Sequence, residues 1–502
     1  RIEHNVIESV NSNNIFTEIL MEANDTHFDW LARYGKAISR KDIHMAKHWF
    51  ALSDKELQRI AKHIADAFFH GFISQSRQIA GRSNVRLLYS IGQEAIAKQV
   101  FQEFMERGIS PIPLEPQSTS IPYVYELDHR FDEMLNNYVS SQDMLNQFYE
   151  NSMQKYQQSV ENICGFVRVS SFGREAKASR SQYAFEPPQK MRDAYQQYQS
   201  HVRDVESRIL RPDRLSFCSV AFPDIDIGKD FSDIFEEFMH INTEDSAHYE
   251  EIQQQLIDIL DTCDSVHIQG LGLNKTDIHI CFRKELDAKT QSNFLNCGGD
   301  LNIPYGEVFT TPSLTGTEGV YFVNEIFIQN NYYKNLYLKF RDGRIVDYGC
   351  KNFSEQECNK KYVKDHLLQG YEEIAMGEFA IGSNTRVYRV AKKYNIFSKL
   401  PILIAEKMGP HIAIGDPCFA RGEDSPVYNM YNQKEMIARE NEITCNRLIN
   451  RHCYFNVHID ITLPFDEIKE LAGYKNGERI CIIIQNGKFV PSFAEELNQN
   501  ME

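Results

Sequence analysis

The chain has 502 residues and a formal net charge of −16 at pH 7, and 42% of its residues are hydrophobic. This length exceeds one ordinary hydrophobic core, so we expect at least two domains. The acidic charge argues against nucleic-acid partners, which require a basic surface. The sequence has no apolar run that approaches the length of a membrane helix, about 18 residues, so no membrane partner is expected.

The cysteines predict a reduced protein. All eleven lie between Cys164 and Cys481 without a CxxC pair, and an odd number fits no complete disulfide framework. These features predict mostly buried thiols in a cytoplasmic protein. The first residue is Arg1 rather than Met, so the removal of a targeting segment stays an open alternative.

Residues 1–225 are predicted to form an α/β domain. Ser53 and Glu56 make a capping box in front of an apolar helical stripe, which predicts the start of a helix. Patterns typical of a strand, a helix and a second strand follow at residues 85–92, 93–108 and 109–116. This order is that of a parallel α/β unit. Amphipathic patterns across residues 126–210 predict exposed helices that cover the sheet or form an interface.

Short strand patterns dominate the second half of the chain, so we expect a domain boundary near residue 225. An Asp-Gly pair at residues 342–343 and an Asn-Gly pair at residues 486–487 are typical of the tight turns of β-hairpins. Residues 226–502 are therefore expected to form an α+β domain with a mixed sheet.

The stretch Asn456–Pro464 has the pattern of a strand with one apolar face. Every second residue is apolar, namely Val457, Ile459, Ile461 and Leu463. His458 and Asp460 lie between them, so both side chains would point to the opposite face, about 7 Å apart along the strand. This second face is either wetted by solvent or part of a metal site.

Four further stretches place ligand-type side chains beside short apolar strands. These side chains are Glu307, Glu378, His411, and His279 with Asp277. Each stretch alone is weak evidence, because a single glutamate or histidine on a strand is usually structural. Together they supply the carboxylates and imidazoles that hold two divalent ions about 3.5–4 Å apart. Nitrogen and oxygen ligands without thiolate favour Zn, Co or Mn, with Mg also open.

The order and context of these motifs resemble the M29 metallopeptidases, the aminopeptidase T family. The stretch "NIPYGEVFTTP" contains Glu307, "GEFAIG" contains Glu378, "HIAIG" begins with His411 and "HIDITLP" begins with His458. The resemblance extends over residues 265–465 and is weaker upstream. The longer loop after His411 is similar to that of a longer bacterial branch of the family.

The resemblance implies that residues 226–502 form a dinuclear metallopeptidase domain, which holds two divalent metal ions. The implied metal ligands are Glu307, Glu378, His411, His458 and Asp460. The family forms homodimers and removes N-terminal residues from peptides with a free N-terminus, and the same is expected here. In such a mechanism the two ions activate a shared water, and Glu378 both binds metal and moves the proton.

The chain departs from the family at one catalytic position. The family has a tyrosine seven or eight residues after its equivalent of His411, and the tyrosine hydroxyl stabilises the oxyanion. Here these positions hold Cys418, expected to be a buried thiol without a role, and Phe419, which has no donor. Losing one such donor typically costs about 10²–10³-fold in rate. Tyr428 and Tyr431 are the nearby candidates to replace it.

Two alternatives to an active aminopeptidase stay open. A catalytically silent or slow member would keep the fold and act in peptide binding or as a scaffold, which the missing hydroxyl at Phe419 favours. A dinuclear hydrolase of a non-peptide amide would keep the same ligands and act on another substrate. Metal content, release from amino-acid anilides and a metabolite screen separate these readings.

Overall fold

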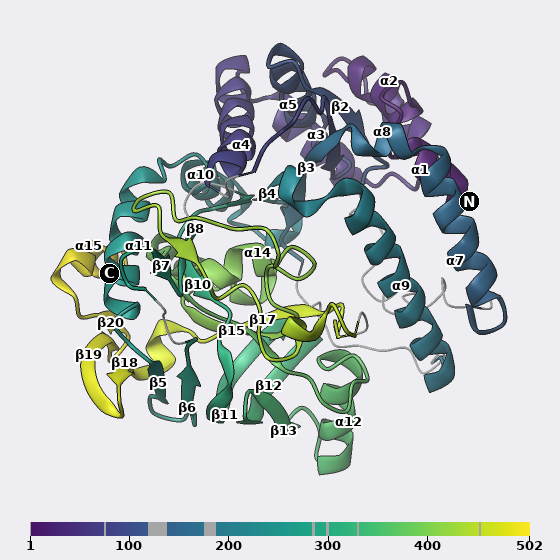
Figure 1. Cartoon of the computed structure of the whole chain (residues 1–502). Coiled ribbons are helices and arrows are strands. Elements are labelled where there is room, and N and C mark those ends of the chain that lie inside the picture. Colours follow the sequence, from purple (N-terminus) through teal and green to yellow (C-terminus); the bar gives the residue numbers. More distant parts are fainter. Residues whose placement is uncertain are drawn as a thin grey trace.

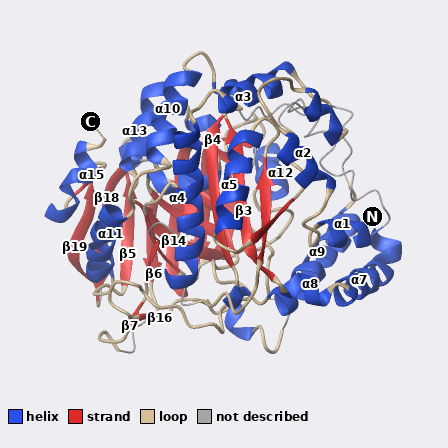
Figure 2. Ribbon diagram, turned by 90° about the horizontal axis from the view of Figure 1, so that it is seen from above, coloured by secondary structure: helices blue, strands red, loops and turns tan. Residues whose placement is uncertain are grey.

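The structure is a computed structural model of the chain (Figure 1). It describes residues 2–74, 77–118, 138–174, 187–283, 287–297, 301–328, 331–450 and 453–501. These residues form three larger sheets and one short strand pair, with helices on the outside (Figure 1, Figure 2). No helix in the described part of the chain is long and apolar enough to cross a membrane.

The first sheet is entirely parallel, in the order β2-β1-β3-β4-β9. Its strands are β1 (Asn84–Tyr89), β2 (Ser110–Pro113), β3 (Ile163–Phe172), β4 (Ser216–Pro223) and β9 (Leu301–Ile303). Helices that pack against it are α4 (Asp54–Ser74), α5 (Glu94–Glu106) and α10 (Phe231–Ile241) (Figure 2). The capping box is present, since Ser53 N donates to Glu56 Oε2 and Glu56 N donates to Ser53 Oγ. The predicted parallel α/β unit is therefore confirmed.

The other described segments of the N-terminal half are mainly helical. Their helices are α1 (Ile2–Glu8), α2 (Ile15–Glu22), the 3-10 helix η1 (Asp29–Tyr34), α3 (Arg40–Phe50), α7 (Tyr138–Lys155), α8 (Gln157–Glu161) and α9 (Gln189–Leu210). The long helices α7 and α9 pack on each other at the right of Figure 1. They confirm the predicted amphipathic helices over part of residues 126–210. Residues 126–137 and 175–186 of that range lie outside the described residues, and residues 163–172 form strand β3 instead of a helix.

The second sheet is an eight-stranded antiparallel sheet in the order β13-β12-β11-β6-β5-β18-β19-β20. Its strands are β5 (Ser265–Gly270), β6 (Asp277–Cys281), β11 (Ser313–Ile328), β12 (Asn331–Arg341), β13 (Arg344–Gly349), β18 (Ile468–Lys475), β19 (Glu478–Gln485) and β20 (Lys488–Phe489). The β12–β13 and β19–β20 hairpins turn at residues 342–343 and 486–487, as predicted.

The third sheet, which we call the ligand sheet, is antiparallel in the order β17-β15-β14-β10-β8. Its strands are β8 (Leu295–Cys297), β10 (Glu307–Thr310), β14 (Met376–Gly382), β15 (Pro410–Gly415) and β17 (His458–Thr462). The predicted mixed sheet is wrong, because both larger sheets of the described second half are antiparallel. In the eight-stranded sheet, hairpins join β5 to β6, β11 to β12, β12 to β13, β18 to β19 and β19 to β20, and a hairpin connection gives antiparallel pairing. A short parallel pair joins β7 (Gln291–Ser292) and β16 (Glu435–Met436).

Helices of the second half surround these sheets. The α-helices are α11 (Ala247–Leu260), α12 (Gln356–His366), α13 (Thr385–Tyr394), α14 (Ile402–Ala405) and α15 (Glu495–Gln499). Besides η1, the described 3-10 helices are η3 (Pro212–Arg214) before the predicted boundary, η4 (Ile225–Ile227) at it, and η5 (Phe397–Lys399), η6 (Glu406–Met408), η7 (Thr444–Asn446), η8 (Phe465–Glu467) and η9 (Ser492–Ala494) after it. The boundary near residue 225 stays a prediction, and β9, which lies beyond it, pairs with β4 of the first sheet.

One face of the ligand sheet is buried in the main hydrophobic core. Its fully buried residues on that face are Phe379, Ile381, Ile412, Ile414, Ile459 and Ile461. The Tyr321 hydroxyl of β11 donates to the Ile461 carbonyl at 2.8 Å and so links the ligand sheet to the eight-stranded sheet. Because side chains alternate between faces, burying this apolar set fixes the opposite set on the other face.

We predict that Ile461→Ala lowers the free energy of unfolding by about 2–5 kcal/mol, because it leaves a cavity at a fully buried position. The control is Ile480→Ala on β19, where the residue is 46% exposed and the loss should be under about 1 kcal/mol. Urea unfolding of both variants measures the difference. Equal losses would contradict the two-faced description of the ligand sheet.

Candidate metal centre

All five ligands predicted from the sequence lie on one face of the ligand sheet, opposite its apolar face, on four neighbouring strands. Strand register places each of four ligands opposite a small residue. These pairs are Glu307 with Gly382, His411 with Ala380, Asp460 with Ala413, and His458 with Gly415. Glu378 shares this face because it is two residues from Ala380. Small residues between the ligands leave space for the larger side chains to converge.

The ligand atoms form two groups that share Glu378. In one group, His411 Nε2 lies 3.2 Å from Glu307 Oε1 and 3.7 Å from Glu378 Oε1. In the other, His458 Nε2 lies 3.0 Å from Glu378 Oε2 and 3.4 Å from Asp460 Oδ1. One carboxylate therefore presents a separate oxygen to each histidine, an arrangement suited to bridging two cations.

Both histidines are oriented by backbone carbonyls. His411 Nδ1 lies 3.2 Å from the Gly409 carbonyl, and His458 Nδ1 lies 2.7 Å from the Asp416 carbonyl. A carbonyl only accepts, so Nδ1 carries the proton in each ring and Nε2 faces the carboxylates. The buried His411 Nε2 makes no hydrogen bond of ordinary geometry. Metal-binding histidines are typically held in this way, so these residues fit a metal centre.

The electrostatics of the cluster favour bound cations. Burial alone lowers the pKa of His411, but Glu307 and Glu378 outweigh it and raise this pKa well above its ordinary value. Burial raises the pKa of Glu378, whereas His411 and His458 lower it more strongly, to well below its ordinary value. Excess negative charge thus draws positive charge to both Nε2 positions, which a proton or a metal ion can supply.

Two further charged residues belong to this cluster, and they were missed in the sequence. Lys407 is 2% exposed and forms ion pairs with Glu307 and, at 2.9 Å, with Glu406 Oε1. Burial, together with the charges of Glu307 and Asp460, raises the pKa of Glu406 to about 7, although Lys407 acts in the opposite direction. The available signal was a Glu-Lys pair placed directly after the apolar run at residues 400–405.

Gly382, which lies opposite Glu307, allows Glu406 and Lys407 to approach the ligand sheet. A Cβ atom on Gly382 would lie 2.4 Å from the Glu406 carbonyl oxygen and 2.6 Å from the Lys407 carbonyl carbon. Both contacts are with backbone and cannot relax by a rotamer change. Gly382 therefore lets η6 sit against the ligand sheet, where Lys407 reaches Glu307.

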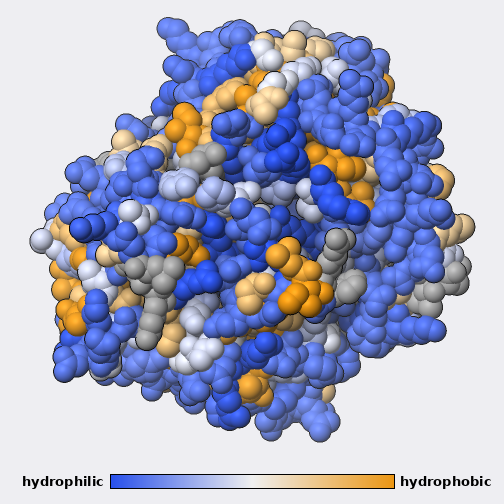
Figure 3. All heavy atoms as spheres, viewed as in Figure 1, coloured by the Kyte–Doolittle hydropathy of each residue, from blue (hydrophilic) through white to orange (hydrophobic). Residues whose placement is uncertain are grey.

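The cluster opens into a cavity of about 830 Å³. The N-terminal half forms part of its wall, through Arg77, Arg203, Glu206, Ser207, Pro212 and Phe217. Arg203 Nη1 of α9 donates to the Asn456 carbonyl at 2.7 Å, and Arg421 Nε donates to Asp204 Oδ1 at 2.8 Å. Both contacts tie α9 to loops beside the ligands. On the face drawn in Figure 3, hydrophilic residues cover most of the surface, between hydrophobic patches.

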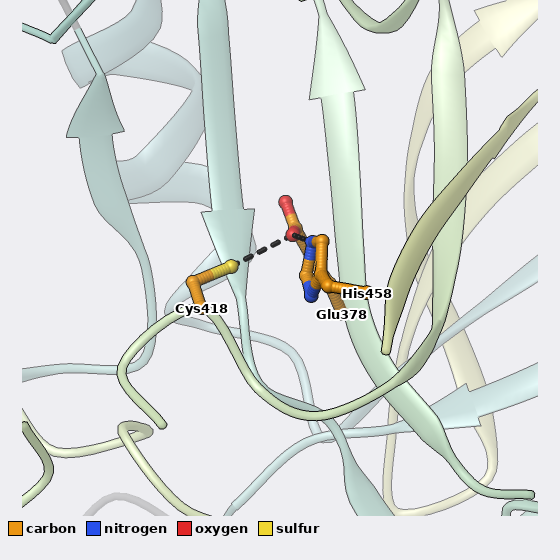
Figure 4. A group of neighbouring side chains, drawn as sticks. All are labelled: Glu378, Cys418 and His458. Atoms are coloured by element: carbon orange, nitrogen blue, oxygen red, sulfur yellow. Dashed lines mark hydrogen bonds and ion pairs between the residues drawn. The ribbon is translucent and has the colours of Figure 1, made fainter. Parts of the chain in front are cut away.

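The two positions at which a tyrosine was expected have different surroundings. Cys418 is exposed to the cavity, so the expectation of a buried thiol is wrong, and its Sγ lies 2.7 Å from Glu378 Oε2 (Figure 4). Partial loss of hydration inside the cavity and the charge of Glu378 raise the pKa of this thiol well above its ordinary value, although His458 lowers it. Phe419 also lines the cavity, and its ring stacks on Phe309 at a centroid distance of 5.9 Å.

Other candidates from the sequence do not join the cluster. The Tyr431 hydroxyl donates to Glu250 at 3.1 Å, and neither Tyr428 nor Tyr431 is among the described residues that line the cavity. His279 lies in the eight-stranded sheet, where its ring stacks on His267 at 3.9 Å, and Asp277 contacts the same His267.

A comparison with models of protein families agrees with the resemblance found in the sequence motifs. The model of the thermophilic metalloprotease (M29) family matches residues 53–434, about three quarters of the chain. A comparison with curated proteins found no match. Among solved structures, wild-type AmpT from Thermus thermophilus aligns with 87% of this chain and 99% of its own, with a TM-score of 0.49 and 15% sequence identity.

We predict that Gly382→Ala lowers the free energy of unfolding by about 1–3 kcal/mol, because the new methyl group overpacks the contact with η6. It should also weaken metal binding, since Glu406 and Lys407 are displaced. The control is Gly422→Ala, whose Cβ would meet its nearest atom at an ordinary 3.4 Å. Urea unfolding and metal titration of both variants test this. Unchanged stability and metal affinity for Gly382→Ala would contradict it.

Proposed function

Because the chain belongs to the thermophilic metalloprotease (M29) family, we propose that this metal-dependent peptidase is an aminopeptidase with a two-metal site. The observation that carries the proposal is Glu378, which directs one oxygen toward His411 and the other toward His458. We further propose that its substrates are peptides with a free N-terminus. A homodimeric state and a cytoplasmic location stay predictions from the sequence.

The ligand set divides into two positions. Position 1 is formed by Glu307, His411 and Glu378 Oε1, and position 2 by His458, Asp460 and Glu378 Oε2. Zn, Co or Mn suit this mixture of nitrogen and oxygen donors, with Mg as a further option. Lys407 binds Glu307 and so offsets part of the negative charge of position 1.

Two bound divalent ions would supply a nucleophilic water of lowered pKa, polarise the scissile carbonyl and bind the substrate α-amine. The chain itself supplies orientation and proton transfer. Glu378 lies between both positions, where its carboxylate can accept a proton from the attacking water and pass it to the leaving amine. Glu307 and His411 are 5% and 1% exposed, whereas the His458 side chain is 32% exposed. Substrate therefore approaches from the side of position 2.

We predict release of the chromophore from leucine and arginine anilides in the presence of Co²⁺ or Zn²⁺, and its loss on treatment with a chelator. An N-acetylated leucine anilide should resist cleavage, because its blocked amine cannot bind. Glu378→Gln should lower kcat by at least about 10²-fold, a typical effect of losing a general base. The control Glu478→Gln alters an exposed residue of β19 and should leave kcat unchanged.

A catalytically silent or slow member is the second candidate, favoured by the phenylalanine at position 419. This protein would bind metal and peptides without hydrolysing them. If the protein binds metal stoichiometrically but releases no product from a broad panel of substrates, the silent member is the correct function and the aminopeptidase is not.

We predict that Phe419→Tyr raises kcat by at least about tenfold, because a hydroxyl in the cavity can donate to the oxyanion. Phe309→Tyr is the matched control, since Phe309 lines the same cavity, stacks on Phe419 and is equally buried, at 8% exposed. Steady-state kinetics of both variants on leucine anilide provide the measurement. The same kcat in Phe419→Tyr and in the unmodified enzyme would show that another group serves as the donor.

A further inference from the structure

We propose that Cys418 is a thiolate ligand of position 2, which makes this position selective for thiophilic ions such as Zn²⁺ over Mn²⁺ or Mg²⁺. The inference rests on the proposed function, because it concerns the same metal site. It replaces the purely nitrogen and oxygen ligand set expected from the sequence. Cys418 then has a role of its own, rather than filling the place of the missing tyrosine.

The proposal rests on the positions of the ligand atoms around Cys418. Ligand atoms of Glu378, Cys418 and His458 all lie within 4.8 Å of one another. Figure 4 shows the three side chains directed toward each other from β14, from the loop after β15 and from β17. Asp460 Oδ1 lies 3.4 Å from the same His458 nitrogen. Three donors thus converge on position 2, the number of protein ligands that catalytic zinc sites use while they keep a fourth position open.

The loop that carries Cys418 is held by its neighbour Asp416. The two carboxylate oxygens of Asp416 accept hydrogen bonds from the backbone nitrogens of Phe455 and Asn456, both at 2.7 Å. The carbonyl of the same residue accepts the hydrogen bond from His458 Nδ1. One residue therefore positions the thiol loop and orients the histidine with which the thiol would share a metal ion.

The loop is also fixed beyond Cys418. Arg421 donates from Nε to Asp204 of α9 and from Nη2 to the Asn456 side chain at 2.8 Å. Its guanidinium group lies 4.4 Å from the centre of the Tyr454 ring. Contacts on both sides hold Cys418 beside Glu378, as expected of a prearranged ligand.

A thiolate at Cys418 is compatible with the charge of the cluster. The four carboxylates are Glu307, Glu378, Glu406 and Asp460, and the single ammonium group is that of Lys407. With neutral histidines and ionised carboxylates, this set has three excess negative charges, so two divalent ions would leave one excess positive charge. A Cys418 thiolate cancels it. On metal binding the S–H bond breaks, the sulfur keeps the electron pair and forms the bond to the metal, and the proton leaves to solvent.

Cobalt substitution tests the proposal without any measurement of activity. The full-length protein loaded with Co²⁺ should show thiolate-to-cobalt charge-transfer absorption in the near ultraviolet. Cys418→Ser should lack this band and still bind cobalt at position 1, whereas the control Cys445→Ser, at an exposed cysteine of the same long loop, should keep it. Cys418→Ser should also lower Zn²⁺ affinity by at least about tenfold. Its affinity for Mn²⁺ should change less than twofold.

A second measurement on the unmodified protein covers the case in which the variant does not fold. Bound Zn²⁺ should protect Cys418 from alkylation, as read by peptide mass mapping, while the exposed Cys358 and Cys445 react with or without metal. Bound cobalt without the band, or alkylation of Cys418 in the zinc-loaded protein, overturns the thiolate ligand and leaves the two-metal peptidase standing. A protein that binds neither cobalt nor zinc overturns both proposals.

Discussion

The alternation of side chains on an antiparallel sheet is the constraint on which the site depends. Four adjacent strands each place an apolar residue on one face and a ligand or a small residue on the other. The apolar set is locked into the core, so a slip of one residue in any strand would move its ligands to the buried face. Strand pairing therefore selects the ligand geometry, and the core stabilises a polar face that could not stabilise itself.

Without bound cations, this polar face lowers the stability of the fold. Buried carboxylates repel one another, and each loses hydration on folding. Lys407 relieves part of the repulsion at Glu307, and the histidines relieve part of it at Glu378. The stability lost here is offset by the apolar reverse face and by its link to the eight-stranded sheet through Tyr321. Such a division between a stable face and a strained functional face is common in enzymes.

Much of this centre could be predicted from the sequence, because its signals are local. The alternation around His458 and Asp460 identified both the strand and its two faces, and Glu307, Glu378 and His411 had the same kind of context. The antiparallel pairing could not be predicted, since short apolar strands do not reveal which neighbour they join. Glu406 and Lys407 were missed as site residues because they lie in a short 3-10 helix whose position depends on tertiary contacts. Cys418 was named but given no role, because the path of its loop depends on such contacts as well.

The connection between β9 and β10 has a consequence for how the chain can be divided. Strand β9 pairs with β4 of the parallel sheet, and only three residues separate the end of β9 from Glu307, the first residue of β10. Helix α9 is tied to Asn456 and Arg421 on the other side of the cavity. The two halves of the sequence are thus connected by strand pairing and hydrogen bonds at the site itself. Neither half alone would form the complete site. A chimaera of two relatives would need compatible residues where β9 pairs with β4 and where α9 contacts the loops beside the site.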